Sequence, residues 1–188
     1  MPSSPSADSP APSTSPTTGG VTVRRARTTD VRTVRRLIDS YARDGILLDK
    51  AMVTLYEDIQ EFWVAERAGG ADAGAVVGCG ALHVMWEDLA EVRTLAVDPA
   101  ARGMGVGHAL LDRLLSTAGD LGVRRVFCLT FEVDFFTRHG FVEIGETPVD
   151  GDVYTELLRS YDEGVAEFLG LERVKPNTLG NSRMLLHL

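Results

Sequence analysis

The chain has 188 residues, of which 44% are apolar and 24% charged, a composition typical of a globular protein with one domain. Its formal net charge of −8 disfavours binding to the phosphate backbone of nucleic acids, and no apolar run approaches the roughly 20 residues of a membrane span. Cys79 and Cys128 lie in apolar, strand-like runs, which indicates buried thiols in a reducing compartment. We therefore expect a cytoplasmic protein without nucleic-acid or membrane partners.

Residues 1–20 differ in composition from the rest of the chain. They contain six serines and five of the eight prolines, with almost no bulky apolar side chain. Such a segment buries too little apolar surface to offset the entropy lost on ordering, so a disordered tail is expected. The folded domain is then expected to cover residues 21–188.

Apolar patterning predicts strands and helices in mixed order along this domain. Alternating apolar and polar residues predict strands, and apolar residues three and four positions apart predict helices. Only three residues separate the apolar runs 75–86 and 90–97, which favours an antiparallel hairpin. A single layered domain of mixed α/β class accounts for this order. The sequence predicts strands at 21–27, 62–66, 75–86, 90–97, 125–130, 141–144 and 182–188, and helices at about 31–44, 51–59, 108–118, 133–139 and 152–169.

The strongest chemical signal is the glycine-rich loop RGMGVG at 102–107, which leads straight into a predicted helix. Its glycines let the backbone approach a ligand closely, and the free N–H groups of the helix would point back into the loop. With the charge of Arg102, these features predict a cradle for a diphosphate. The loop lacks the GK[ST] of a P-loop, and His108 and Leu110 break both registers of a dinucleotide-binding fingerprint. The scattered histidines predict no metal site.

The strand EVRTLAV, the turn DPAAR, the loop RGMGVG and the helix HALLDRLL together resemble the acetyl-CoA-binding core of the GNAT N-acetyltransferases. The family's Arg/Gln-x-x-Gly-x-Gly/Ala pattern falls on Arg102, Gly105 and Gly107. The segment FFTRHGF at 135–141 resembles the motif that closes this core. The resemblance implies a central mixed twisted sheet flanked by helices, with acetyl-CoA as co-substrate and no metal. It implies coenzyme contacts at Leu95, Ala96, Val97, Arg102, Gly103, Met104, Gly105, Val106, Gly107, His108 and Phe136.

Four further segments resemble the short, single-domain N-acetylglutamate synthases of arginine biosynthesis. They are GILLDKAMVTLYEDIQEFWVAE, GCGALH, FCLTFEVDFFTRHGF and NSRMLL. The resemblance implies transfer of acetyl to the α-amine of L-glutamate, by direct attack in a ternary complex. At this length we expect no amino-acid-kinase domain, and so no arginine feedback through one. L-Glutamine remains open as the acceptor because it differs from glutamate by one charge, and a homodimer also remains open.

Acetyl transfer requires a neutral amine, and so a proton acceptor. Glu91 lies where some acetyltransferases of this superfamily place a catalytic glutamate, but it also suits a structural pair with Arg93, which would lower its pKa. Strand alternation predicts that Leu95 and Val97 share the face of these two residues. By the same resemblance, Lys50, Arg93 and Ser182 would lie at the acceptor site, where cationic groups hold the carboxylates. The arginine that long synthases carry two residues before this serine is Gly180 here, so Arg183 would take its place. Each of the three basic residues could equally be a surface charge.

Many GNAT enzymes carry a tyrosine that protonates the leaving sulfur, at the position where this chain has Phe136. The candidates for the missing acid are Cys128, His139, Ser182 and solvent. Two other functions therefore stay open. One is an acetyltransferase for another small amine or a protein amino group, and the other is an acetyl-CoA-sensing module without turnover.

Overall fold

The computed structural model describes residues 17–18, 20–43, 45–47, 50–171 and 180–188. The tail expected over 1–20 therefore lies almost entirely outside the described residues. Its last part includes a two-residue strand, β1 (Thr17–Thr18).

One central sheet contains eight strands within the described part of the chain. After β1 they are β2 (Val21–Arg25), β3 (Phe62–Arg67), β4 (Val76–Trp86), β5 (Leu89–Val97), β6 (Arg125–Thr130), β7 (Val142–Glu143) and β8 (Ser182–His187). Their order across the sheet is β1-β2-β3-β4-β5-β6-β8-β7. Neighbouring strands are antiparallel except β5 and β6, which are parallel. The predicted mixed sheet and the β4–β5 hairpin are confirmed.

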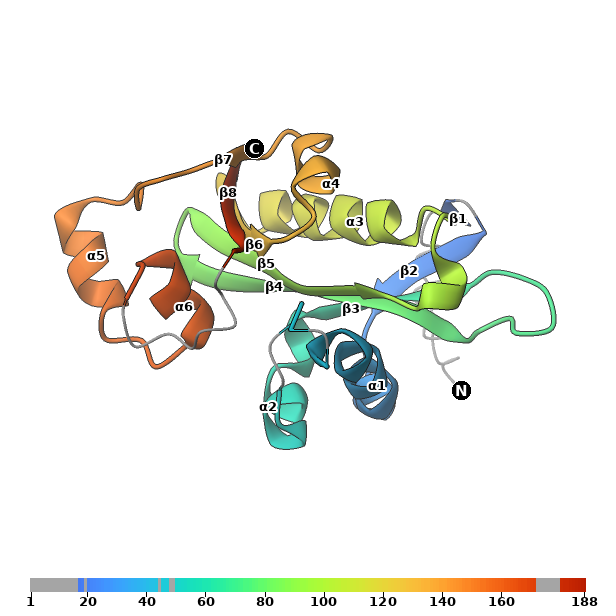
Figure 1. The fold of residues 1–188 in the computed structure, drawn as a ribbon. Coiled ribbons are helices and arrows are strands. Elements are labelled where there is room, and N and C mark those ends of the chain that lie inside the picture. Colours follow the sequence, from blue (N-terminus) through green and yellow to red (C-terminus); the bar gives the residue numbers. More distant parts are fainter. Residues whose placement is uncertain (1–16, 19, 44, 48–49, 172–179) are drawn as a thin grey trace, which may run out of the picture.

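Helices cover both faces of this sheet (Figure 1). On one face lie α1 (Val31–Ala42) and α2 (Met52–Glu57), and on the other lie α3 (Val106–Asp120) and α4 (Val133–Thr137). Two more helices, α5 (Gly151–Leu157) and α6 (Glu163–Phe168), lie at one end of the sheet, where they share a core cluster with residues of β4, β5, β6 and β8. Three short 3-10 turns complete the described elements, at Thr28–Asp30, Ile59–Glu61 and Pro99–Ala101.

Two glycines in β4 allow α3 to pack closely on the sheet. A Cβ on Gly78 would lie 2.7 Å from a methyl carbon of Val106, and one on Gly80 would lie 3.0 Å from a methyl carbon of Leu114. Any larger residue would push α3 away from the strands. The close approach fixes the N-terminal end of α3 beside the end of β5.

A β-bulge interrupts β5 opposite Gly80. The pairing with β4 shifts by one residue between Arg93 and Ala96, so that Thr94 and Leu95 together take the place of one residue. Thr94 has a φ of +58° and is the only non-glycine residue with positive φ in the described ranges. Such a backbone is costly for a β-branched residue, and the surrounding sheet must hold it in place.

The bulge reverses the alternation of side chains along the rest of β5. Leu95 packs with Val92 in the cluster against α3, whereas Ala96 packs in the cluster around α1. The prediction that Leu95 and Val97 share the face of Glu91 is therefore wrong, because the extra residue exchanges the two faces.

Candidate active site

The sheet splits between β5 and β6. These strands pair only over residues 89–91 and 125–127, although β5 runs on to Val97 and β6 to Thr130. A cleft of about 460 Å³ lies at this split, lined by residues between α1 and α2, the middle of β5, the end of β6, α4 and the start of α6. Glu91 is the last residue of β5 that pairs with β6, and its side chain lines the cleft.

Glu91 is a buried carboxyl group, with only 5% of the residue exposed. Nη2 of Arg93 lies 2.8 Å from its Oε2, outside hydrogen-bonding geometry, so this oxygen has no hydrogen-bond donor among the described residues. Burial raises the pKa of Glu91 and Asp162 raises it further, while Arg93 opposes both. We expected Arg93 to lower the pKa of Glu91, but the effect of desolvation is larger and the pKa is raised.

Asp162 ties α6 to β5. Its carboxylate accepts two hydrogen bonds from Arg93, at 2.9 and 3.1 Å. It accepts a third, at 3.0 Å, from the N–H of Val165, and Asp162 thereby caps the start of α6. Burial alone would raise the pKa of Asp162, but these hydrogen bonds lower it to about 2. Arg93 is therefore held between Glu91 on its own strand and Asp162 at the start of α6.

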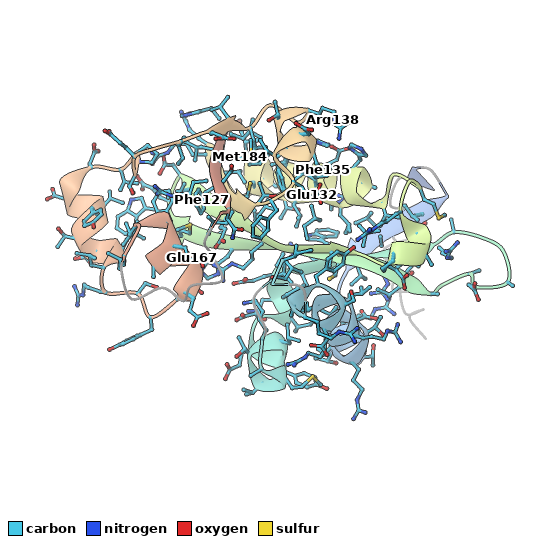
Figure 2. All side chains as sticks on the ribbon, viewed as in Figure 1. Phe127, Glu132, Phe135, Arg138, Glu167 and Met184 are labelled. Carbon is cyan, nitrogen blue, oxygen red and sulfur yellow. The ribbon has the colours of Figure 1, made fainter. Side chains whose placement is uncertain are left out.

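Helix α6 also brings Glu167 to the cleft, a residue that the sequence analysis missed (Figure 2). Burial, with the nearby charges of Glu91 and Glu163, raises the pKa of Glu167 to about 7. The sequence carries a weak signal for it, because Glu167 is a single acid between Ala166 and Phe168, which are both apolar and buried.

The predicted acceptor-binding residues divide into two groups. Lys50 and Arg93 line the cleft, whereas Ser182 and Arg183 are outside its lining. The guanidinium of Arg183 instead donates to the hydroxyl of Thr147, at 3.2 Å, and to the carbonyl of Phe168. The hydroxyl of Ser182 lies 3.3 Å from a carboxylate oxygen of Glu143.

The predicted diphosphate loop is open at its surface. Gly103 and Gly105 have φ values of +79° and +75°, and apart from the adjoining residues no atom of the described part of the chain lies within 4 Å of a Cβ built on either one. Gly105 is the N-cap of α3, so the free N–H groups of this helix end at the loop. The backbone thus fits an anionic group. The side chain of Arg102 lies at Tyr41, with Nη2 3.3 Å from the hydroxyl oxygen.

Phe135 connects this loop to the cleft. Its ring lies 3.5 Å from the position of a Cβ on Gly107, and the same side chain lines the cleft beside Phe136. His108 packs on the Phe135 ring from the loop side, with 5.0 Å between ring centres. Loop and cleft therefore meet at one aromatic residue, whose position on α4 is labelled in Figure 2.

The three side chains considered as acids are not part of the cleft lining. Cys128 is fully buried in the core, and burial raises the pKa of its thiol well above the usual value. His139 contacts His108, with 3.1 Å between Nε2 and Nδ1, and Ser182 contacts Glu143. Phe136 lines the cleft without a hydroxyl group.

Comparisons with known proteins give the family. Residues 58–143 match the acetyltransferase (GNAT) domain. An amino-acid acetyltransferase from Mycobacterium tuberculosis is 63% identical over 164 residues, which cover 87% of this chain and 92% of the relative. An uncharacterized N-acetyltransferase from Chlorobaculum tepidum is 36% identical and is covered to 76%.

Solved structures agree with this match. The structure of Rv2747 from M. tuberculosis, in complex with CoA and NLQ, has a TM-score of 0.84 at 63% identity, covering 88% of this chain and 98% of that one. N-acetylglutamate synthase from Neisseria gonorrhoeae, complexed with coenzyme A and N-acetyl-glutamate, has a TM-score of 0.70 at 25% identity. The alignment covers 89% of this chain but 35% of that longer synthase.

The chain belongs to the GNAT acetyltransferase family, as the sequence resemblance predicted. Within this family it is an enzyme of the amino-acid acetyltransferase group, which uses acetyl-CoA as co-substrate. No helix in the described ranges is long and apolar enough to cross a membrane. The same ranges contain no cluster of three or more His, Cys, Asp or Glu residues suited to a metal ion.

Proposed function

We propose that the chain transfers the acetyl group of acetyl-CoA to the α-amine of L-glutamate, as an N-acetylglutamate synthase of arginine biosynthesis. The observation that carries this proposal is the buried carboxyl group of Glu91 at the split of the sheet, in a cleft that also contains Lys50. The similarity to amino-acid acetyltransferases and to N-acetylglutamate synthase supports the choice of acceptor. A cytoplasmic location and a homodimer stay predictions from the sequence.

In this proposal the coenzyme occupies the loop and the split. The N–H groups of residues 103–108 and the positive end of α3 bind the diphosphate, and Phe135 and Phe136 pack along the pantetheine arm. The backbone of residues 95–97 binds the amides of the arm and the thioester oxygen. The carbonyl of Val97 already accepts a 2.5 Å hydrogen bond from the Tyr41 hydroxyl, which anchors the end of β5.

Glu91 accepts the proton of the acceptor's ammonium group. Its raised pKa suits this role, because a carboxylate that binds protons more tightly is a stronger base. The neutral amine nitrogen then forms a bond to the thioester carbon, and the carbon–sulfur bond breaks. As the amide forms, the nitrogen loses a second proton, and the CoA thiolate takes up a proton through water, so that the products are the N-acetyl amino acid and CoA. Lys50 binds a carboxylate of the acceptor in this scheme.

L-Glutamine is the second candidate acceptor, and the charge of the cleft favours it. Arg93 is one of two basic residues in the described lining and is already engaged by Glu91 and Asp162. Lys50 therefore remains to bind one carboxylate of the acceptor. The acidic residues of the cleft would repel a second carboxylate, but they would not repel the neutral side-chain amide of glutamine. The acidic residues of the described lining are Asp58, Glu91, Glu132, Asp162, Glu163 and Glu167.

A thiol-release assay across the twenty amino acids tests the proposal. We expect the highest kcat/KM with glutamate, whereas a higher value with glutamine would assign the second candidate. Turnover with other amines alone would point to a different acetyltransferase. Coenzyme binding in calorimetry without thiol release from any amine would point to a sensing module. Glu91→Gln should lower kcat by about 10²–10⁴ with unchanged acetyl-CoA affinity, and the exposed Glu156→Gln serves as the matched control.

A further inference from the structure

Glu167 is a buried carboxyl group that the mechanism above does not use. Its residue is 8% exposed, and its side chain lines the same cleft as Glu91. One of its oxygens, Oε1, is buried and has no hydrogen-bond partner within the described part of the chain. A buried carboxylate in this state is unfavourable, so the group must hold a proton over part of the neutral pH range or meet a ligand.

Most of the charges that act on Glu167 are negative. From β5 it faces Glu91 and Arg93, and from α6 it faces Glu163 and the N-cap residue Asp162. Arg93 is the single positive group among these four, and its charge is shared between Glu91 and Asp162. Burial and the like charges therefore favour the protonated form of Glu167 up to about neutral pH.

The other walls of the cleft carry few compensating groups. Lys50 and Asp58 lie on the side of α2, and Glu132 lies after β6. His83, which acts on Glu91 from β4, is paired with Glu61 at 2.7 Å. In the described ranges, these walls thus supply no cation that is bonded to Glu167.

Helix α6 holds the two carboxyl groups in a fixed relation. Gly164 lets its backbone lie against Glu91, and Asp162 ties its first turn to Arg93. Glu167 lies one turn after Gly164 on the same short helix, so both carboxyl groups enter the cleft from elements that are bonded to each other.

We infer that Glu167 tunes Glu91: when Glu167 is ionised, its buried negative charge strengthens Glu91 as the acceptor of the amine's proton. This inference rests on the proposed acetyl transfer. Glu167 acts through Glu91 and is a positioning residue. The transferred proton moves from the ammonium nitrogen to the Glu91 carboxylate and leaves to water after the acetyl group has moved. Ionisation of Glu167 raises the proton affinity of Glu91 by like-charge repulsion, so activity rises as Glu167 loses its proton.

An experiment without turnover tests the carboxyl pair directly. In protein labelled with ¹³C at the glutamate side-chain carboxyls, NMR should show one group that titrates with a midpoint of about 7 and is missing in Glu167→Gln. The midpoint of Glu91 should fall in the same variant, because a like charge has been removed. Absence of any such titration, or an unchanged Glu91 midpoint, would overturn the inference.

The pH profile of kcat/KM tests the effect on catalysis. The rising limb near pH 7 should disappear in Glu167→Gln, with kcat lowered about tenfold, and Glu167→Asp should retain the limb. Glu156→Gln, an exposed glutamate on α5, should match the unmodified enzyme. A limb that persists in Glu167→Gln would assign Glu167 a structural role only. The NMR titration needs no acceptor substrate, so it tests the interaction between Glu91 and Glu167 independently of acetyl transfer. An absent activity with glutamate would therefore contradict the proposed function, whereas an absent titration would contradict the interaction between the two carboxyl groups.

Discussion

The backbone of Gly164 lies directly against the carboxyl group of Glu91. A Cβ on Gly164 would lie 2.3 Å from Oε2 of Glu91, closer than real side chains approach. Helix α6 therefore covers Glu91 only because residue 164 has no side chain. The contact explains how a carboxyl group in an open cleft becomes almost fully buried.

Gly164→Ala should displace α6 from Glu91 and reduce activity. The added methyl group overpacks a site with polar atoms on both sides, which we expect to cost about 1–3 kcal/mol of stability. Urea unfolding and kcat/KM measure both effects. Gly119→Ala, a glycine within α3 with open space around it, should leave stability unchanged or increase it. Full activity and stability of Gly164→Ala would show that α6 does not shield the carboxyl group of Glu91 from solvent.

Asp162→Asn should destabilise the protein at neutral pH. The folded-state pKa of Asp162 is lowered to about 2 from the usual 3.8, so its stabilisation is present above pH 3.8 and is lost as the pH falls toward 2. This shift corresponds to about 2 kcal/mol. Urea unfolding at pH 7 should show that loss in the variant, and the difference from the unmodified protein should shrink toward pH 2. Asp72→Asn, at an exposed aspartate, is the control and should leave the stability unchanged. If Asp162→Asn were as stable as the unmodified protein at pH 7, the hydrogen bonds between Asp162 and Arg93 would not stabilise the packing of α6 on β5.

Gly105→Val should weaken acetyl-CoA binding by more than about tenfold. A side chain at this position would project into the open space of the loop and would strain a backbone with φ of +75°. Calorimetry with CoA measures the effect. Gly70→Val, at a glycine with φ of +88° in the β3–β4 loop, imposes a similar strain away from the site. If Gly105→Val and Gly70→Val bind CoA equally well, the diphosphate does not lie on the loop.

Lys50→Met should raise the KM for the amino-acid acceptor and leave CoA affinity unchanged. The substitution keeps an unbranched side chain, one atom shorter, but removes the positive charge available to an acceptor carboxylate in the cleft. We expect a loss of about tenfold in kcat/KM. An unchanged KM would remove Lys50 from acceptor binding.

The elements that the sequence predicted well depend on local pattern. The glycine loop at 102–107 and the helix after it follow from residue types within a short stretch, and the β4–β5 hairpin follows from two apolar runs and a short turn. The placement of Glu91 at the site came from the family resemblance rather than from periodicity.

The features that the sequence did not predict depend on partners far along the chain. The bulge at Thr94 is a property of the pairing between β5 and β4 opposite Gly80, and no local pattern marks the extra residue. The strand position of Arg183 was predicted, but the groups that its guanidinium contacts come from other segments. Glu167 reaches the cleft because Gly164 allows α6 to pack on Glu91, which is a relation between distant segments.

A crystal structure with bound CoA and an N-acetylated amino acid is the most direct test of acetyl transfer at the β5–β6 split. We expect the diphosphate on the N–H groups of residues 103–108, the sulfur between the two strands, and the acetylated nitrogen within hydrogen-bonding reach of Glu91. A coenzyme bound elsewhere, or an acceptor nitrogen remote from Glu91 on the far side of α6, would contradict this assignment.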